Sequence, residues 1–424
     1  MKSRIILLVF LLLPVPASAE PIVITGKMIP AFLGKNIVDL RVTNHAGACI
    51  PFQIDQVDSA DYVCPNGKEP NKGSGMLDTA DEIVFLWEDA DTGGPSQRIK
   101  STGETAKVKG RTCVTIGHGS EDRFVYITDN PSIPLSPVSY IDYDNAKELI
   151  TTPYFYANFG HDRFHFTHAG VKNFSTNSYL NLTNELRIRI ILKALWGILP
   201  ITYSEDNMVC LVKRYKAGPI RLIRRGDFHL NLGLFFEGSH AAVNQICYPQ
   251  LVRVPVYIHL PMKFRTLFKV AYIEMSPVFR QEAADFSFDV ASCGISFPLG
   301  SARRLDTLVE ANPNHTCMTA HNGLLGYGWV LDADIDNRLL SGSGYRVTMP
   351  SDRGGIGQCG FRLTVRDLPK GYYLIGNWVL FSGSDAAGLL DACDRISSMA
   401  SVAVEGTTTM YCNQLGKVTA FRKR

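Results

Sequence analysis

Polar and apolar residues alternate along much of this chain with the period of a β-strand. Residues 185–190 (Glu-Leu-Arg-Ile-Arg-Ile) alternate strictly, which is typical of a strand with one face in water. Shorter β-branched or aromatic runs at residues 22–24, 124–127 and 252–260 also predict strands. Residues 188–201 are apolar enough to suggest a membrane span, but Lys193, Gly197 and Pro200 interrupt them. We therefore interpret them as a strand that leads into a turn.

Proline and glycine recur between these runs throughout the chain. Many short strands separated by such turn signals predict a mostly antiparallel β-sandwich. One helix is expected, from about residue 384 to residue 401, because Leu389, Leu390, Cys393 and Ile396 fall on one helical face.

The first 19 residues have the features of a secretory leader. Lys2 and Arg4 precede an apolar run at residues 5–13, and Ala17-Ser18-Ala19 before Glu20 is an A-x-A cleavage signature. The run is shorter than the roughly 20 apolar residues that a membrane span needs, so no transmembrane segment is expected after cleavage. The leader predicts an exported, periplasmic or extracellular protein.

Charge and cysteine content narrow the class of protein. The net charge of +3 falls by two when the leader is removed, and the basic residues form only short pairs, so no nucleic-acid binding is expected.

Ten cysteines in an exported chain predict up to five disulfides. Cys49 and Cys64 bracket a loop-like stretch, and we expect them to form a pair.

The most distinctive text is Pro-Phe-Gln-Ile-Asp-Gln-Val-Asp at residues 51–58, followed by Leu-Asp-Thr-Ala-Asp-Glu-Ile-Val-Phe-Leu at residues 77–86. These segments predict a β-hairpin with acidic residues gathered at its loop end. The block resembles a group of uncharacterised exported bacterial and archaeal proteins with a PFQ-I-D-x-V-D … D-E-(I/L)-V-F pattern. It is also similar to a Q-V-D-D … D-E-L-V-F signature in galactose-mutarotase-like super-sandwich domains.

The close resemblance covers about residues 20–95, with weaker echoes at residues 123–126, 142–144 and 218–225. The chain departs from the pattern at Ser59-Ala60-Asp61-Tyr62, where relatives often have an Asp-Gly-Asp-rich turn. The resemblance implies a large super-sandwich, and together with the strand pattern, the one short C-terminal helix and the cysteines it predicts an all-β, mostly antiparallel fold stapled by disulfides. We expect one domain from residue 20 to residue 424, with a subdivision point near residue 340.

Two acidic groups suggest calcium as a cofactor. Asp332, Asp334 and Asp336 alternate like the start of a calcium loop, although Asn337 and Ser343 do not fit an EF-hand. They form either an irregular calcium site or a solvated turn. The same alternatives hold for a second group, which comprises Asp55, Asp58, Asp81 and Glu82.

Residues 161–168 are the only dense histidine segment. One interpretation of His161 and His165 is that they are surface-strand residues beside the core. A second is that one of them, with a carboxylate such as Asp162 or Glu185, serves as general acid and base on a sugar. A third alternative is a zinc or copper site that includes His168.

Aromatic residues suggest where a sugar could bind. Trp87, Tyr154 and Tyr156 could stack against a sugar ring or belong to the core.

These observations favour an exported, non-catalytic binding or structural protein with carbohydrate as its ligand. The alternative is a carbohydrate-active enzyme, either mutarotase- or epimerase-like or a polysaccharide lyase or hydrolase. A third alternative is an envelope assembly factor with a protein partner.

Overall fold

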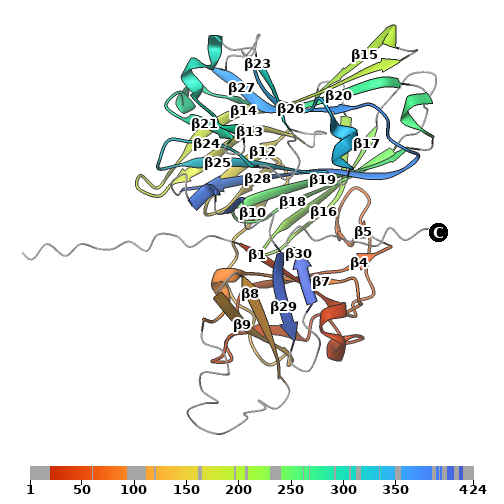
Figure 1. Ribbon diagram of the computed structural model, residues 1–424. Coiled ribbons are helices and arrows are strands. Elements are labelled where there is room, and N and C mark those ends of the chain that lie inside the picture. Colours follow the sequence, from red (N-terminus) through yellow and green to blue (C-terminus); the bar gives the residue numbers. More distant parts are fainter. Residues whose placement is uncertain are drawn as a thin grey trace, which may run out of the picture.

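The computed structural model describes residues 20–413 of this chain apart from residues 60, 93–110, 119–120, 161–164, 195–196, 206–208, 230–239, 261, 267, 291–292, 305–306, 312–316, 334, 349–354, 384–387, 391, 394–398 and 405–409. Two large antiparallel sheets form its upper part, which we call the sandwich (Figure 1). The order of strands in the first sheet is β10 (Asp142–Asp144), β11 (Leu149–Thr151), β12 (Phe155–Phe159), β13 (Phe166–Asn173), β14 (Ser178–Ala194), β20 (Phe268–Phe279), β27 (Gly357–Val365), β26 (Gly344–Thr348) and β23 (Thr307–Glu310), with β15 (Leu199–Ser204) beside β14.

The second large sheet is also antiparallel along its described ladders. The order of its strands is β22 (Ile295–Pro298), β21 (Ser287–Val290), β24 (Cys317–His321), β25 (Gly326–Ala333), β28 (Gly371–Ser382), β19 (Leu251–Leu260), β18 (His240–Cys247), β17 (Leu222–His229), β16 (Val209–Ala217) and β6 (Asn66–Gly67).

The main hydrophobic core lies between these two sheets. Phe155 on β12 stacks on Phe381 on β28 with ring centroids 4.3 Å apart, and Trp329 on β25 meets Phe361 on β27 at 5.0 Å. In β14 the apolar residues of the alternating segment face this core, while Arg189 is exposed. The period-two pattern therefore produces the sandwich, and the expected all-β fold is confirmed.

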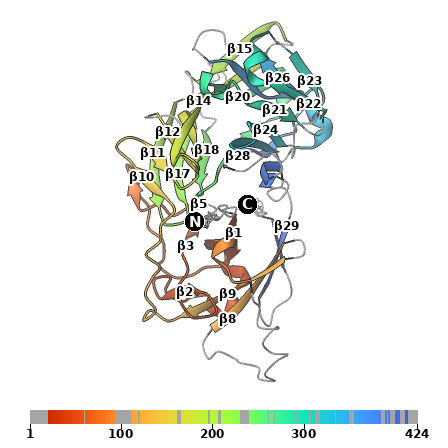
Figure 2. The ribbon, with the colours of Figure 1, turned by 90° about the vertical axis from the view of Figure 1, so that its left-hand side faces the viewer.

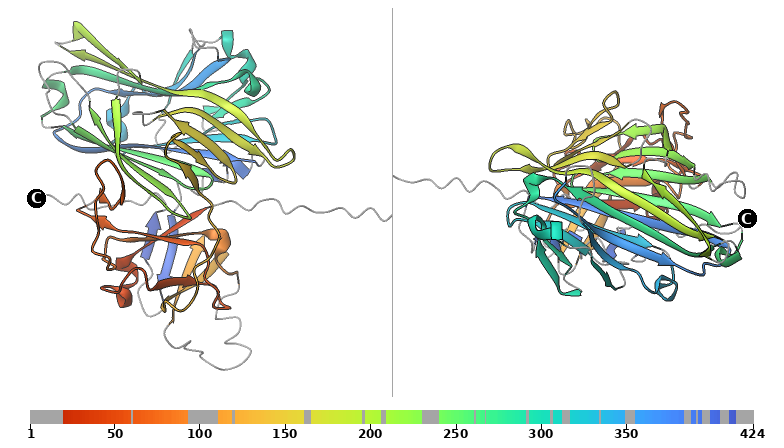
Figure 3. Two further views of the ribbon diagram at one scale, coloured as in Figure 1. Left: turned by 180° about the vertical axis from the view of Figure 1, so that it is seen from behind. Right: turned by 90° about the horizontal axis from the view of Figure 1, so that it is seen from above.

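The strands at both ends of the chain form a smaller part, which we call the terminal body (Figure 2). Its own core lies apart from that of the sandwich and includes Ile24, Phe85, Val114 and Ile127. The last two strands pair beside β8, which brings the blue end of the chain next to the orange strands (Figure 3). One of its sheets comprises β2 (Leu40–Thr43), β9 (Glu121–Asp129), β8 (Arg111–His118), β29 (Met399–Val404) and β30 (Met410–Asn413), and the other comprises β1 (Pro21–Thr25), β7 (Glu82–Leu86) and β3 (Phe52–Asp55).

A third hydrophobic cluster joins the terminal body to the sandwich, and we call this region the junction. It packs Val84 and Leu86 of β7 against Ile223 of β17 and Trp378 of β28. Beside it lies a small hairpin of β4 (Val57–Asp58) and β5 (Asp61–Tyr62). The expectation of a single domain from residue 20 to residue 424 stays a prediction. The described 3-10 helices are η1 (Gly26–Met28), η2 (Pro30–Phe32), η3 (Trp87–Asp89), η6 (Phe264–Thr266), η7 (Gln281–Ala283), η9 (Leu299–Arg304) and η10 (Asn337–Leu340).

Local predictions of strands are confirmed, including the hairpin in the distinctive block. β3 pairs with β7 so that Asp55 lies opposite Glu82 at its loop end. Residues 188–201 form the end of β14 and the start of β15, which pair as a hairpin. No helix among the described residues is long and apolar enough to cross a membrane.

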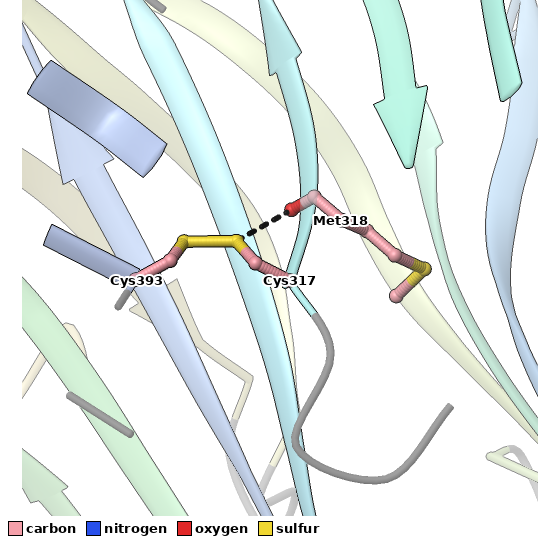
Figure 4. The surroundings of a disulfide bond; sticks show 3 residues. All are labelled: Cys317, Met318 and Cys393. Atoms are coloured by element: carbon pink, nitrogen blue, oxygen red, sulfur yellow. Dashed lines mark hydrogen bonds between the residues drawn. A yellow bond between two sulfur atoms is a disulfide. The ribbon is translucent and has the colours of Figure 1, made fainter. Parts of the chain in front are cut away.

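The short helix near the end of the chain is confirmed, but its predicted end and the predicted Cys49–Cys64 disulfide are wrong. Residues 388–390 and 392–393 are helical, but the helix does not reach residue 401, because β29 begins at Met399 and pairs with β8. Cys49 and Cys64 do not form a disulfide: both are free thiols, and burial raises the pKa of Cys64 to about 12. The described disulfide instead joins Cys317 on β24 to Cys393 in the helical segment (Figure 4).

Candidate functional site

Of the acid–base candidates in the predicted histidine site, the structure describes His165 and Glu185. His161 and Asp162 lie outside the described residues. His165 is buried, with 1% of its surface exposed, and it precedes β13 rather than lying on a surface strand. Glu185 lies on β14, where its carboxylate accepts from Arg187 Nε at 3.2 Å. The acid–base and metal roles of this segment stay predictions.

The three predicted sugar-stacking residues lie in different places. Trp87 is buried in the core of the terminal body under the guanidinium of Arg123, 5.4 Å from its ring centroid. In the sandwich, Tyr154 precedes β12 and meets Phe174 edge-on, while Tyr156 lies on β12 and donates to Asn181. A shared stacking surface of these three residues stays a prediction.

The aspartates at residues 332–336, which were expected to bind calcium, differ in burial and in their hydrogen-bond partners. Asp332 is a buried residue of β25, and Asp334 lies outside the described residues. Asp336 caps η10 and accepts from both the backbone and the guanidinium of Arg338, which lowers the pKa of Asp336 to about 2. Over the part of the chain that the structure describes, no group of three or more His, Cys, Asp or Glu residues could hold a metal ion. Calcium binding stays a prediction.

The acidic residues of the distinctive block meet an arginine of the segment 218–225 at the junction. Arg221 is 1% exposed, and its Nε lies 2.7 Å from Asp55 Oδ2. Its Nη2 lies 2.5 Å from Glu82 Oε2, and its Nη1 donates to the Tyr248 hydroxyl at 2.9 Å. Lys216 adds a second cation 2.8 Å from Asp55 Oδ1. The positive charge that faces these carboxylates therefore comes from the sandwich.

Gln53 of the distinctive block links Asp55 to the backbone of the segment 218–225. Its amide donates to Asp55 at 2.8 Å, and its carbonyl oxygen accepts from the backbone N–H of Arg221 at 3.1 Å. Gly218 packs so closely that an added Cβ would lie 2.1 Å from that oxygen. Burial alone would raise the pKa of Asp55, but Arg221 and Lys216 hold that pKa below its ordinary value. These residues form an ionic lock between the two parts of the molecule.

A different buried arginine has no acidic partner. Arg253 lies on β19, is 8% exposed, and places its guanidinium 5.0 Å over the ring of Trp378, its register partner on β28. By contrast, Arg221 and Arg224 each contact a carboxylate. Within the described ranges, no carboxylate forms an ion pair with Arg253. A guanidinium in this state is suited to a carboxylate, sulfate or phosphate from outside the chain.

Arg253 begins a stripe of residues on the outer face of the second large sheet. Alternate residues of β19 share one face, and the opposite face contributes to the main core. Register pairs Pro255 with Gly376 in the next row, and neither of them has a large side chain. Farther along, His259 and Tyr372 stack with centroids 4.4 Å apart, and Tyr372 is 67% exposed. The stripe thus runs from a buried cation to an exposed aromatic pair.

A second unusual group, which we call the acid group, comprises Glu88 and Asp89 in η3. Tyr140 donates to Asp89 Oδ1 at 2.8 Å. Burial, with the nearby carboxylates of Glu20 and Asp89, raises the pKa of Glu88 to about 8, and burial also raises that of Asp89. Glu88 Oε2 and Asp89 Oδ2 are buried without a hydrogen-bond partner, and no basic side chain among the described residues forms an ion pair with either of them.

Sequence reasoning missed both Arg253 and the acid group. The sequence predicted residues 252–260 only as a strand and assigned no role to Arg253, Glu88 or Asp89. The available signal for Arg253 was an arginine inside an otherwise apolar run, which is unusual in a buried strand.

No protein-family model matches the chain, and no curated protein matches it. Among solved structures, an alpha-mannosidase from Enterococcus faecalis is 7% identical with a TM-score of 0.44, over 89% of this chain and 42% of that one. A protein in the glycosyl hydrolase family 38 from Enterococcus faecalis is 8% identical with a TM-score of 0.48, over 87% and 42%. A heparinase III is 5% identical with a TM-score of 0.33, over 67% and 44%. This chain therefore spans less than half the length of these proteins, and likenesses at this level carry no information on ligand or activity.

Proposed function

We propose that this chain is an exported, non-catalytic β-sandwich protein that binds a carbohydrate with an anionic group, held by Arg253. The observation that carries the proposal is the guanidinium of Arg253, which is buried over Trp378 without an acidic partner. A buried charge without a counter-charge is costly, typically by several kcal/mol. An anionic ligand would form an ion pair with this guanidinium and so gain binding free energy that is not available to a neutral ligand.

The rest of the stripe fits a sugar attached to that anionic group. Aromatic faces stack on the apolar faces of sugar rings, and the exposed ring of Tyr372 lies at the outer end of the stripe. The row of Pro255 and Gly376 next to Arg253 has no large side chain, and the row of Tyr257 and Leu374 separates it from His259 and Tyr372. A uronate would place its carboxylate on Arg253 and its ring along the row of Pro255 and Gly376. Export is supported by the leader at residues 1–19.

The test is the binding of oligogalacturonate and oligoglucuronate to the oxidised protein beginning at Glu20, measured by calorimetry beside neutral oligosaccharides of the same length. Because a hydrogen bond to a charged group contributes about 1.5–3 kcal/mol, R253Q should weaken uronate binding by at least about tenfold. R362Q is the matched control. Arg362 also lies over an aromatic ring, 4.2 Å from the centroid of Tyr272, but it has Glu274 as its partner.

The expected result is uronate binding that R253Q weakens and R362Q leaves unchanged. Two results would overturn the proposal: no binding of either uronate by the folded protein, or binding that R253Q does not alter. A protein that binds neither uronates nor neutral sugars would instead favour a structural or protein-binding role.

The acid group supports a second candidate function, a sugar-directed enzyme. A carboxyl whose pKa is raised to about 8 beside another buried carboxyl is an arrangement that general acid–base sites use. Here Glu88 would act as the acid and Asp89 as the base. Release of reducing sugar or epimerisation, abolished by E88Q, would support this function over simple binding.

A further inference from the structure

The backbone of Glu20 is held at the edge of the acid group. Its carbonyl oxygen accepts from Trp87 N–H at 2.8 Å, and its own nitrogen donates to Glu88 Oε1 at 3.3 Å. Pairing of Pro21 with Leu86 continues this contact into the β1–β7 ladder. The position of the Glu20 nitrogen is therefore set by the sheet and does not depend on the residues before it.

Among the residues that the structure describes, no basic side chain forms an ion pair with Glu88 or Asp89. Glu20 and Glu88 bring two carboxylates, and Asp89 brings a third into the same electrostatic neighbourhood. Tyr140 and Tyr154 face them from the sandwich and carry no positive charge. The buried oxygens Glu88 Oε2 and Asp89 Oδ2 still have capacity to accept hydrogen bonds.

Hydrolysis of one peptide bond would supply the missing cation. The A-x-A signature places cleavage between Ala19 and Glu20. A peptidase adds water across that bond, leaves a carboxyl group on Ala19 and frees the α-amino group of Glu20, which takes a proton. The Glu20 nitrogen then changes from an amide with one donor hydrogen to an ammonium with three donors and a positive charge.

We propose that removal of the leader creates an ion pair between the Glu20 α-ammonium and the Glu88 carboxylate, and that this pair completes the junction between the terminal body and the sandwich. The inference rests on the export included in the proposed function, and it is independent of the Arg253 site. It gives Glu88 a structural partner in the processed protein. The unprocessed chain has the same fold but a less stable junction, because Glu88 Oε2 and Asp89 Oδ2 are then buried without a hydrogen-bond partner.

The test compares two forms of one protein. The first begins at Glu20, freed by a site-specific protease, and the second is the same protein with its α-amino group acetylated. Thermal unfolding should show the free form to be more stable by at least about 2 °C. E88Q should abolish this difference. E282Q is the matched control, because Glu282 is an exposed residue that pairs with Arg280, and it should leave the difference intact.

Equal melting temperatures of the two forms in the wild-type background would overturn the inference, as would a difference that survives in E88Q. Peptide mass analysis of protein exported by a bacterial host adds an independent check, since a mature terminus other than Glu20 also overturns it. Uronate binding by both forms is measured in parallel. Loss of that binding counts against the Arg253 site alone, so the two failures are distinguishable.

Discussion

Replacing Arg221 with leucine is the sharpest test of the ionic lock at the junction. The substitution removes the guanidinium that contacts Asp55, Glu82 and Tyr248 and leaves the two carboxylates in place. The side chains of Asp55 and Glu82 are 0% and 7% exposed, so water cannot replace the lost partner. Loss of one partner from a buried ion pair costs about 3–5 kcal/mol.

The contacts that Asp55 and Glu82 keep in R221L determine where the loss of stability falls within the range of about 3–5 kcal/mol. Asp55 keeps Lys216 at 2.8 Å, and Glu82 keeps the hydroxyl of Tyr62 at 3.0 Å. Because Lys216 still neutralises one carboxylate, we expect a loss near the lower end, about 3 kcal/mol.

The assay is urea-induced unfolding of the oxidised protein followed by tryptophan fluorescence. The control variant is R338L, since Arg338 pairs with Asp336 at a surface where its side chain is 88% exposed, and its loss should change the unfolding free energy by at most about 1 kcal/mol. A double-mutant cycle of R221L with D55N should give a coupling energy of at least about 1 kcal/mol. If R221L costs no more than R338L, the buried network does not hold the two parts together and the reasoning fails.

Three further predictions concern pH, the disulfide and calcium. The pKa of Asp55 is lower in the folded protein than in the unfolded chain, so ionised Asp55 contributes its full stability above the unfolded pKa of about 4 and loses it as pH falls through the folded pKa. Between pH 5 and pH 3, the urea midpoint of the wild type should therefore fall more than that of D55N. Parallel pH profiles of the two proteins would contradict this prediction. The Cys317–Cys393 bond spans 76 residues, so its loss in C317A/C393A should cost up to about 4 kcal/mol, measured by urea unfolding beside C49A, which removes a free thiol and should change little. If residues 332–336 bind calcium, added calcium should raise the melting temperature over that in EDTA, and an unchanged value would refute calcium binding.

Much of the strand structure was predictable because its signal is local. The alternation at residues 185–190 reports which side chains of β14 face the core, and neighbouring residues suffice to read it. The interrupted apolar run at residues 188–201 likewise predicted the β14–β15 hairpin. The helix near residue 390 was predicted, but its end was not, because pairing with β8 draws Met399 into a strand.

The cysteine pairing failed for a related reason. Cys49 and Cys64 are close in sequence, which makes a disulfide plausible on spacing alone, but Cys64 packs into the apolar cluster at the junction. Cys317 and Cys393 come together because the helical segment packs on β25 and so lies beside β24, and nothing near either residue in the sequence indicates this.

Local patterning therefore settled the all-β class, the turn positions and the hairpin that carries the acidic block, because side-chain alternation and turn residues act over a few neighbouring positions. The tertiary structure decided which charge meets which. Asp55 and Arg221 are 166 residues apart, and only the packing of the terminal body on the sandwich brings them within 2.7 Å. The same packing gives Arg253 no ion pair with a carboxylate of the described residues and gathers Glu20, Glu88 and Asp89. Burial and pairing of charge depend on distant parts of the chain, which is why a sequence pattern alone does not reveal them.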